Sequence, residues 1–383
     1  MSRAGPKAGG SSGGSGGRRV TLARVAGELG VSAMTVSNAY NRPDRLSGAL
    51  RERVFETADR LGYNGPDPVG RSLRRQRTDV VGVLYSNPLS YAFDDPAAVS
   101  FLRGLSAVTE GADLGLLLVP AASGSSGGRD LRAAAQAAVD GFVVYSMSDE
   151  EPLLAAALGR DLPAVVVDQP FREGVPFVGI DDEAAAREAA GHLLELGHER
   201  LGVVSFALSP DGREGVADLG RQGGAAFHVS RSRLRGYRGA IEDADLPWPE
   251  VPVYECPGST AALGHRAAGA LLSLQQRPTA ILASSDQLAL GVLAAAEELG
   301  LSVPGDLSVV GFDDVPQGAV ADPPLTTVRQ DHDEKGSLAG RMLVSLLRGE
   351  DGPGPRRLPT RLVVRASTAP PPRLRAATGG ALP

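Results

Sequence analysis

The sequence VTLARVAGELGVSAMTVSNAYNRPDRLSGALRERVFETADRLGY, residues 20–63, carries apolar side chains at helical spacing in three short blocks. Because residues three and four apart share one face of a helix, this spacing predicts helices over residues 22–29, 33–40 and 48–61. The first two helices are joined by a turn that contains Gly30. Two short helices around such a turn predict a helix-turn-helix, a motif whose second helix enters the major groove of DNA.

Hydroxyl side chains stand where these three helices begin. Thr21, Ser32 and Ser47 each precede a helical block, where a hydroxyl oxygen can accept hydrogen bonds from the unpaired backbone N–H groups of the first turn. Gly30 can end the first helix because glycine adopts the left-handed conformation easily. We therefore expect a small three-helix unit, whose core the third helix closes with Leu50, Val54, Phe55, Ala58 and Leu61.

The second helix presents a distinctive outward face. Its buried side is expected to hold Val36 and Tyr40, which leaves small, neutral side chains to face outward, namely Ala33, Met34, Ser37 and Asn38. A helix that fits a groove about 12 Å wide needs such side chains, whereas a merely solvated helix more often carries Glu and Lys. This face favours DNA binding over the alternative, a plain three-helix bundle.

Charge is distributed unevenly along the chain. The net charge is −6, but residues 18–80 hold twelve Arg against seven Asp and Glu, a net +5, and residues 81–383 carry a net −13. A basic head on an acidic body attracts phosphates to one end and keeps DNA away from the other. The alternative is that the basic residues form an ordinary solvated surface.

After residue 77 the pattern changes to apolar runs that alternate with Ala-rich helical segments. Strands are expected at residues 80–85, 114–119, 141–145, 164–168, 177–180, 201–206, 251–256, 280–283, 308–312 and 361–364. Helices between them are expected at residues 98–111, 182–196, 261–274 and 287–299. Alternating strands and helices predict parallel sheets covered on both faces, and nearly 300 residues exceed one ordinary sheet. We expect two Rossmann-like α/β subdomains with a cleft between them.

Composition sets the expected boundaries. Residues 1–17 are Gly/Ser-rich and predict a disordered tail, followed by a helix-turn-helix domain (residues 18–63), a hinge (64–78) and a two-subdomain body (79–383). Residues 123–128 and the Gly-rich residues 209–230 are expected to be loops, the second unusually long. No apolar run reaches the roughly 20 residues of a membrane helix, and no signal peptide is apparent, so a cytoplasmic protein is expected.

Catalytic and metal sites are not indicated. Cys256 is the only cysteine and is expected to be a buried apolar residue without metal-ligand companions. The Gly/Ser tail lacks the Lys-Ser/Thr of a phosphate loop, and neither His192 nor His198 has a partnered nucleophile. We expect no enzyme activity and no cofactor.

Several motifs together resemble the lactose-repressor/galactose-repressor (LacI/GalR) family. They are residues 20–63, GRSLRRQRT (70–78), DQP (168–170), LGHERLGVVS (196–205), SSDQLALGVLAAAEELGLSVPGDLSVVGFDD (284–314) and PPLTTVRQD (323–331). The resemblance implies a helix-turn-helix head and a body like periplasmic binding proteins. It further implies a sequence-specific transcriptional regulator, a repressor whose affinity for operator DNA is controlled by a small molecule, acting as a cytoplasmic, nucleoid-associated homodimer.

The resemblance also implies which head residues contact DNA. Positions that contact bases in the family correspond to Ala33, Met34 and Asn38 here, and positions that contact the DNA backbone correspond to Thr35, Ser37 and Asn41, with Thr21 expected at the same surface. Asn38 stands where the family often has Arg or His. Since Asn pairs with adenine through two hydrogen bonds, adenine becomes the expected base there.

The hinge is expected to fold on DNA. By resemblance, Leu73 matches a leucine that inserts into the minor groove, with Arg71 and Arg74 along the phosphates. Gly70 replaces the usual Ala, and the connection is about one residue longer than usual, so the hinge helix is expected to be weak without DNA. The alternative is an unstructured basic linker.

Candidate effector residues follow predicted strands, where ligands bind in open parallel sheets. Asp286 and Arg233 match family positions in the ligand cleft, although Asp286 could instead cap a helix. Asp168, Tyr85 and Ser86 are further candidates, with packing as the alternative for the tyrosine. A polar pocket with Asp and Arg suits a sugar, a sugar phosphate or a nucleoside. An uptake-type sugar-binding protein is the alternative function, but that class carries no helix-turn-helix.

Overall fold

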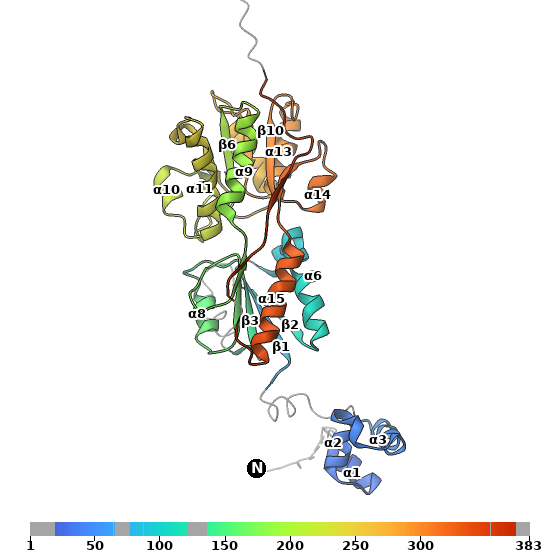
Figure 1. Cartoon of the computed structure of the whole chain (residues 1–383). Coiled ribbons are helices and arrows are strands. Elements are labelled where there is room, and N and C mark those ends of the chain that lie inside the picture. Colours follow the sequence, from blue (N-terminus) through green and yellow to red (C-terminus); the bar gives the residue numbers. More distant parts are fainter. Residues whose placement is uncertain are drawn as a thin grey trace, which may run out of the picture. The chain divides into compact units, whose positions relative to one another are not determined.

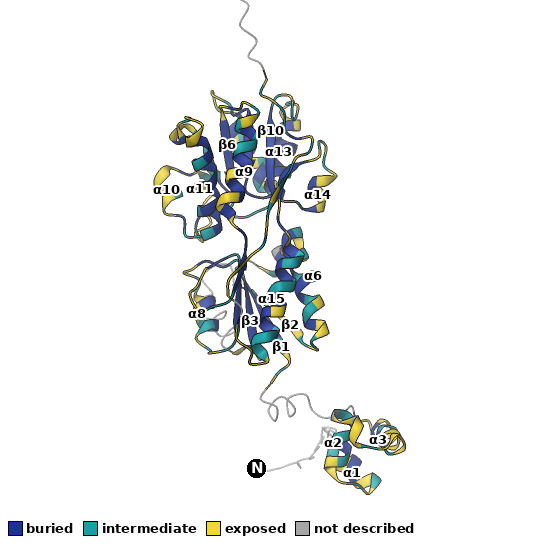
Figure 2. Cartoon of the chain, in the orientation of Figure 1, coloured by how far each residue is buried: buried dark blue, intermediate teal, exposed yellow. Residues whose placement is uncertain are grey.

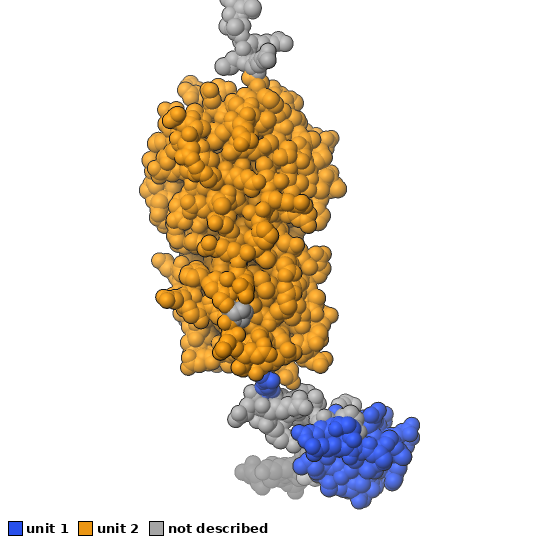
Figure 3. All heavy atoms as spheres, in the orientation of Figure 1, with its two compact units in different colours: residues 1–78 blue, residues 79–383 orange. Residues whose placement is uncertain are grey.

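The computed structural model describes residues 20–63, 65, 77–86, 88–120, 136–352 and 354–372. The chain divides into two compact units, residues 1–78 and residues 79–383 (Figure 3). Each unit encloses buried apolar clusters of its own, as expected for parts of a chain that fold independently.

The first unit is built from the three expected helices. They are α1 (Leu22–Leu29), α2 (Ala33–Asn41) and α3 (Gly48–Leu61), with a 3-10 turn at Pro43–Arg45. Gly30 ends α1 with φ at 66°, a conformation that glycine adopts without strain. The Ser32 hydroxyl accepts from the Thr35 N–H at 3.0 Å, and the Ser47 hydroxyl accepts from the Leu50 N–H at 3.4 Å. These two caps are confirmed.

Thr21 differs from the expectation. It occupies the N-cap position of α1, but its side chain makes no capping hydrogen bond, so the predicted cap is wrong at this residue. The three helices enclose a small core of Val25, Ala26, Val36, Ala39, Val54, Ala58 and Tyr63. The core fixes α1 and α2 against each other through apolar contacts, which leaves the opposite face of α2 exposed.

The second unit contains two lobes, each with its own sheet (Figure 1). The sheet of the first lobe is entirely parallel, in the order β12-β5-β4-β3-β1-β2. Its strands are β1 (Val80–Tyr85), β2 (Gly115–Pro120), β3 (Gly141–Tyr145), β4 (Ala164–Val167), β5 (Phe177–Gly179) and β12 (Arg356–Arg357).

Helices cover both faces of this first sheet. Side chains of alternate residues, such as Val81 and Val83, pack against α6 (Pro96–Gly111) and α15 (His332–Leu347) on one face. Leu84 belongs to the apolar cluster of the other face, where α8 (Pro152–Leu158) lies. The short α5 (Leu89–Asp94) precedes α6. This two-sided burial explains why the strands are nearly continuous apolar runs.

The sheet of the second lobe has the order β13-β11-β10-β9-β6-β8-β7, with antiparallel strands only at its two edges. Its strands are β6 (Leu201–Ser205), β7 (Gly215–Val216), β8 (Val253–Glu255), β9 (Ala280–Ala283), β10 (Ser308–Asp313), β11 (Thr326–Arg329) and β13 (Arg361–Val363). One face packs on α9 (Asp182–Glu195) and α11 (His228–Asp243), the other on α12 (Ala261–Leu272) and α13 (Asp286–Glu298). Shorter helices are α10 (Leu219–Gly223), a 3-10 turn at Trp248–Glu250, and α14 (Pro316–Ala319).

The chain passes between the lobes three times. It crosses from β5 to α9, returns from β11 to α15, and crosses again from β12 to β13. Figure 2 shows the central strands of both sheets buried, whereas edge strands such as β2 and β12 are partly or fully exposed. The predicted two-subdomain α/β body is confirmed. The returning segment, β11 followed by α15, was not among the expected elements.

The long loop expected at residues 209–230 is wrong. This stretch contains β7, α10 and the first residues of α11, and Ala217 and Ala225 are buried in the core of the second lobe. Gly215 begins β7, and Gly223 and Gly224 end α10. The stretch therefore belongs to the folded second lobe.

Candidate functional site

The outward face of α2 holds the residues expected to contact DNA. Ala33 is exposed, and Met34 has 68% of its surface exposed. Thr35, Ser37 and Asn38 are half-buried, and Thr21 is exposed just before α1. Asn41 is the last residue of α2, but its side chain lies outside the described residues.

Two side chains hold the start of α2 in place. The hydroxyls of Ser32 and Thr35 lie 2.8 Å apart, so Thr35 is engaged at the cap as well as standing at the helix surface. The expected hinge residues Arg71, Leu73 and Arg74 lie outside the described residues. Their contact with DNA stays a prediction.

The body contains a cavity of about 520 Å³ between its two lobes. It lies at the carboxyl ends of strands from both sheets, because Tyr85, Tyr145 and Asp168 end or follow first-lobe strands while Phe206 and Asp313 do so in the second lobe. This is the position at which open parallel sheets bind ligands. Of the five expected effector residues, four line the cavity, namely Tyr85, Ser86, Asp168 and Arg233.

Arg233 is fixed on the cavity wall by contacts on several sides. Its Nε donates to Asp182 Oδ1 at 2.9 Å, and one terminal nitrogen donates to the Ser284 carbonyl oxygen at 2.5 Å. The guanidinium carbon lies 3.5 Å from the centroid of the Phe312 ring, within the range of a cation–π contact. Only 5% of Arg233 is exposed. Its charge is thus already balanced by the protein.

Asp168 is likewise engaged. Its carboxylate accepts from Lys335 Nζ at 2.5 Å, and the same ammonium donates to Gln330 Oε1 at 2.5 Å. Gln330 Nε2 in turn donates to Asp313 Oδ1 at 2.6 Å. The chain of contacts runs from the first lobe, through the segment between β11 and α15, to the second lobe. It therefore joins the lobes at the floor of the cavity.

Asp286 differs in position from the other expected effector residues. It is fully buried and is not among the residues that line the cavity. Its carboxylate accepts from the Val315 N–H at 2.8 Å and from the Thr327 hydroxyl at 2.5 Å, so it ties α13 to β11. The preceding Ser285 lines the cavity and caps α13 by accepting from the Leu288 N–H at 3.2 Å.

Two aromatic rings form one end of the cavity. Tyr85 and Tyr145 have ring centroids 5.2 Å apart, and Tyr145 stacks on Phe101 at 4.3 Å. The buried Tyr85 hydroxyl has no hydrogen-bond partner within the described part of the chain, so it is available to a ligand. Ser86 is already engaged, because its hydroxyl donates to the Ser146 carbonyl oxygen at 3.2 Å.

Further ionisable residues that the sequence analysis did not select line the cavity, among them Asp95, Glu151, Asp211, Asp313 and His332. Burial, aided by repulsion from Asp313, raises the pKa of Asp95 to about 6. His332 is 8% exposed, and neither of its ring nitrogens has a hydrogen-bond partner among the residues described; Nε2 lies 3.5 Å from Asp313 Oδ1. The Asp95 carboxylate accepts from the Ala97 N–H and Asp313 accepts from Gln330 Nε2, so of Asp95, Asp313 and His332 it is His332 that leaves hydrogen-bonding capacity unused in the described part of the chain.

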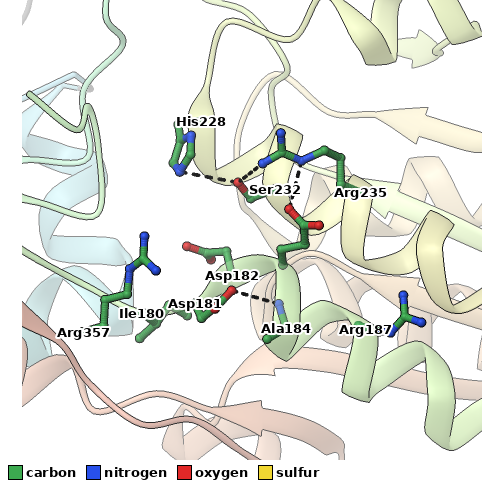
Figure 4. A pocket seen from close by; sticks show the side chains of 10 residues that line it. Ile180, Asp181, Asp182, Ala184, Arg187, His228, Ser232, Arg235 and Arg357 are labelled. Carbon is green, nitrogen blue, oxygen red and sulfur yellow. Dashed lines mark hydrogen bonds and ion pairs between the residues drawn. The ribbon is translucent and has the colours of Figure 1, made fainter.

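A second hollow of about 450 Å³ lies near the start of α9 (Figure 4). Its side chains are mostly charged, and Arg235 pairs with Glu183 at 3.0 Å on its rim. Asp182 lines this hollow, while its partner Arg233 lines the larger cavity. The Asp182–Arg233 ion pair is therefore part of the partition between the two hollows.

Among the described residues, no cluster of three or more His, Cys, Asp or Glu side chains is suited to bind a metal ion. Cys256 is buried as predicted, and burial raises the pKa of its thiol to about 12. No helix among these residues is both long and apolar enough to cross a membrane.

Comparison with known families gives two matches. Residues 21–65 match the model of bacterial regulatory proteins of the lacI family, and residues 190–368 match a periplasmic binding protein-like domain. A helix-turn-helix-type transcriptional regulator of Mycobacterium tuberculosis is 44% identical over 328 residues, which cover 85% of this chain and 91% of that protein.

Solved structures agree with these matches. The transcriptional regulator CelR in complex with cellobiose is 29% identical, with a TM-score of 0.65 over 91% of this chain and 100% of that one. The lac repressor dimer bound to operator and the anti-inducer ONPF is 25% identical, with a TM-score of 0.74 over 92% of this chain and 100% of that one. Similarity thus extends over both units.

Proposed function

Because the chain belongs to the LacI family of bacterial regulatory proteins, it is a DNA-binding transcriptional regulator, and we propose that it is a repressor controlled by a neutral, hydroxyl-rich effector. One observation carries the effector part of this proposal: in a polar cavity between the lobes Arg233 is already paired, while the Tyr85 hydroxyl and both His332 ring nitrogens have no hydrogen-bond partner among the described residues. The uptake-protein alternative is set aside, since the lacI-family match covers residues 21–65.

The proposed DNA contact is the outward face of α2. Exposed Ala33 and Met34, together with Asn38, are proposed to contact base edges, with Thr21, Thr35, Ser37 and Asn41 at the phosphates. Leu73 of the hinge is proposed to enter the minor groove between Arg71 and Arg74 on the backbone. A homodimer, as in the lac repressor structure, would read two half-sites of a near-palindrome.

The charges of the cavity bear on the class of effector. Arg233 is paired with the buried Asp182, and Lys335 with Asp168, so neither cation is free to balance a phosphate. Asp95 and Asp313 add carboxylates to the same space. A phosphorylated effector would meet like charges in a poorly hydrated site, which is unfavourable. Hydroxyl groups of a sugar or a nucleoside can instead donate to the carboxylates and interact with His332 and Tyr85.

Control of DNA binding is proposed to act through the lobes. An effector that contacts Tyr85 and Asp95 from the first lobe and Arg233 and Asp313 from the second would favour one separation of the lobes. This change in the separation of the lobes is proposed to change the conformation of the hinge that follows the helix-turn-helix unit. Coupling of this kind is typically about 1–3 kcal/mol. Whether the effector releases or recruits the protein depends on which state it prefers. The proposed place of action is the cytoplasm, at the nucleoid.

The test is binding of the purified full chain to its own upstream intergenic DNA at two salt concentrations. Wild type is compared with Leu73→Ala and, as a control, with Leu274→Ala, an exposed leucine of the body. Sequence-specific, salt-dependent binding that only Leu73→Ala weakens supports the proposal. Equal weakening by both variants, or binding that is insensitive to salt, contradicts it.

A further inference from the structure

The side chain of Gln169 joins the two lobes of the body. Gln169 follows β4 in the first lobe, and its Oε1 accepts a hydrogen bond at 2.9 Å from the Val229 N–H, in the first turn of α11 in the second lobe. The other end of the same amide, Nε2, donates to the Ser146 hydroxyl of the first lobe at 3.3 Å. Only 4% of Gln169 is exposed. One buried amide group therefore links a strand end of the first lobe to a helix of the second.

The helix that receives this contact has no cap of its own. Phe227 occupies the N-cap position of α11, and its side chain makes no capping hydrogen bond. The N–H groups of a first helical turn need partners from outside the helix, and Val229 is buried. By contrast, α9 and α13 are capped by Asp181 and Ser285, the residues directly before them. Gln169 thus supplies from the first lobe the cap that α11 lacks, and we call its contact with Val229 the interlobe cap.

Gln169 is held in place by its own lobe. Its N–H donates to the Val167 carbonyl oxygen at 2.8 Å, and its carbonyl oxygen accepts from the Met147 N–H at 3.1 Å. Met147 is itself buried in an apolar cluster of the first lobe. Contacts within the first lobe therefore set the position of Oε1. Because hydrogen bonds weaken steeply with distance, the interlobe cap forms only while α11 stays close to the first lobe.

The interlobe cap lies on the wall of the effector cavity. Gln169 and Val229 both line this cavity, and so does Arg233, about one turn further along α11. Arg233 is tied to the second lobe through Asp182 and the Ser284 carbonyl oxygen, so α11 moves with that lobe. A wider separation of the lobes breaks the cap. The net contribution of one such hydrogen bond corresponds to about a fivefold change in the ratio of two states.

We propose that Gln169 is a positioning residue, which caps α11 across the cavity and so favours the lobe separation described here over a wider one. The inference rests on the proposed control of DNA binding through the lobes, and it assigns to one side chain part of the balance that an effector shifts. The contacts through Lys335 and Gln330 join the lobes with other side chains, so they remain in a variant of Gln169. Loss of the cap should therefore shift the lobes without unfolding the body.

The experiment compares Gln169→Met with Gln222→Met in the full chain. Methionine keeps an unbranched side chain of similar length but has no amide group. Gln222 is a matched control, because its amide accepts from Trp248 Nε1 at 2.9 Å and donates to the Ala217 carbonyl oxygen at 2.8 Å, all within the second lobe. Both variants lose two hydrogen bonds, and only Gln169→Met loses one that spans the lobes.

Electron–electron double resonance measures the separation of the lobes, between spin labels at Ala155→Cys on α8 and Ala262→Cys on α12. Both alanines are exposed, and their helices belong to different lobes. Cys256, the only native cysteine, is buried, so the labels attach at the two introduced sites. Dilution with unlabelled chain keeps the measured distances within one protomer.

Gln169→Met is expected to raise the share of molecules at a longer distance about fivefold, whereas Gln222→Met keeps the wild-type distances. Gln169→Asn is a second variant, which keeps the amide on a side chain one methylene shorter. It should behave like Gln169→Met, because its amide does not reach Val229 and Ser146 together. Wild-type distances in Gln169→Asn would show that the reach of the side chain is not what holds the lobes.

Two further results would overturn the proposal: wild-type distances in Gln169→Met, or an equal shift in Gln222→Met, which would indicate general destabilisation. The same distances are measured with the upstream DNA present. If the proposed function also holds, DNA changes the ratio of the two distances in Gln169→Met, because it binds one lobe separation better. A ratio that DNA leaves unchanged rejects control through the lobes, while the longer distance in Gln169→Met alone still supports the interlobe cap.

Discussion

The Lys335 ammonium lies 2.5 Å from the Asp168 carboxylate at the junction of the two lobes, and Lys335 is only 1% exposed. Asp168 follows β4 with φ at 62°, a left-handed conformation that Asp and Asn adopt more easily than most residues. The pair thus depends on a particular backbone turn at a strand end. It also removes one cation from the chemistry available to an effector.

Replacing Asp168 by Asn is expected to lower the free energy of unfolding of the body by about 3 kcal/mol, because the buried Lys335 ammonium loses its counter-ion. Asn keeps the left-handed turn, so the change isolates the charge. Urea unfolding followed by circular dichroism measures the loss. The double variant Asp168→Asn/Lys335→Met should recover part of it, and a double variant as unstable as the single one would show that the charge is not the cause.

Arg233 and Arg235 lie two residues apart on α11 and provide a matched pair. Replacing Arg233 by Met should destabilise the body by about 3 kcal/mol, since it leaves the Asp182 carboxylate buried without its partner. Replacing Arg235 by Met should cost less than about 1 kcal/mol, because its pair with Glu183 is half exposed. Urea unfolding of both variants tests this, and equal losses would contradict it.

Asp95 is expected to make stability depend on pH. Its pKa in the folded protein is raised to about 6, so the folded state binds the proton more tightly, and the stability this gives at low pH is lost as pH rises through 6. Asp95→Asn removes the charge and keeps the cap of α6, where Oδ1 accepts from the Ala97 N–H. The variant should be stabilised at pH 7.5, and this gain should shrink by about 1–2 kcal/mol at pH 4.5.

Unfolding of wild type and Asp95→Asn at both pH values measures this difference. Asp140→Asn is a suitable control, because Asp140 lies outside the cavity and its Oδ2 accepts from the Asp79 N–H. A gain for Asp95→Asn that is the same at both pH values would show that its carboxyl does not titrate in this range.

The centres of the sheets could be predicted because burial on both faces makes their central strands nearly continuous apolar runs. Val80–Tyr85, Gly141–Tyr145 and Ala280–Ala283 agree with the structure to the residue. His332 could not be predicted as a cavity residue, because the chain leaves the second lobe after β11 and returns to the first as α15, which begins at His332. Local sequence contains no signal for that crossing.

The fold of residues 209–227 was missed for a different reason. Its glycines and short apolar runs are typical of a loop, and its main anchor joins Arg221 to Glu255, 34 residues later. A buried glutamate on a strand is a signal of a buried cation, but sequence alone does not say which arginine provides it. Conversely, Asp286 matched a ligand position by its motif, and only its contacts to Thr327 and Val315 show that its carboxylate is engaged within the second lobe.

Substitutions of Met34 and Val36 on α2 should separate effects on DNA recognition from effects on folding. Met34→Ala is expected to leave stability within about 0.5 kcal/mol, because the side chain is 68% exposed, and to alter the preference at one base pair by about 1–3 kcal/mol. Val36→Ala removes methyl groups from a fully buried site and should cost about 2 kcal/mol. Val36→Ala should therefore weaken binding to all DNA sequences equally.

Fluorescence anisotropy of labelled DNA variants measures the base-pair preference, and hydrogen exchange of α1 to α3 in the full chain measures local stability. If Met34→Ala keeps the wild-type base preference, Met34 does not contact bases. If hydrogen exchange is faster in that variant than in wild type, Met34 contributes to the core.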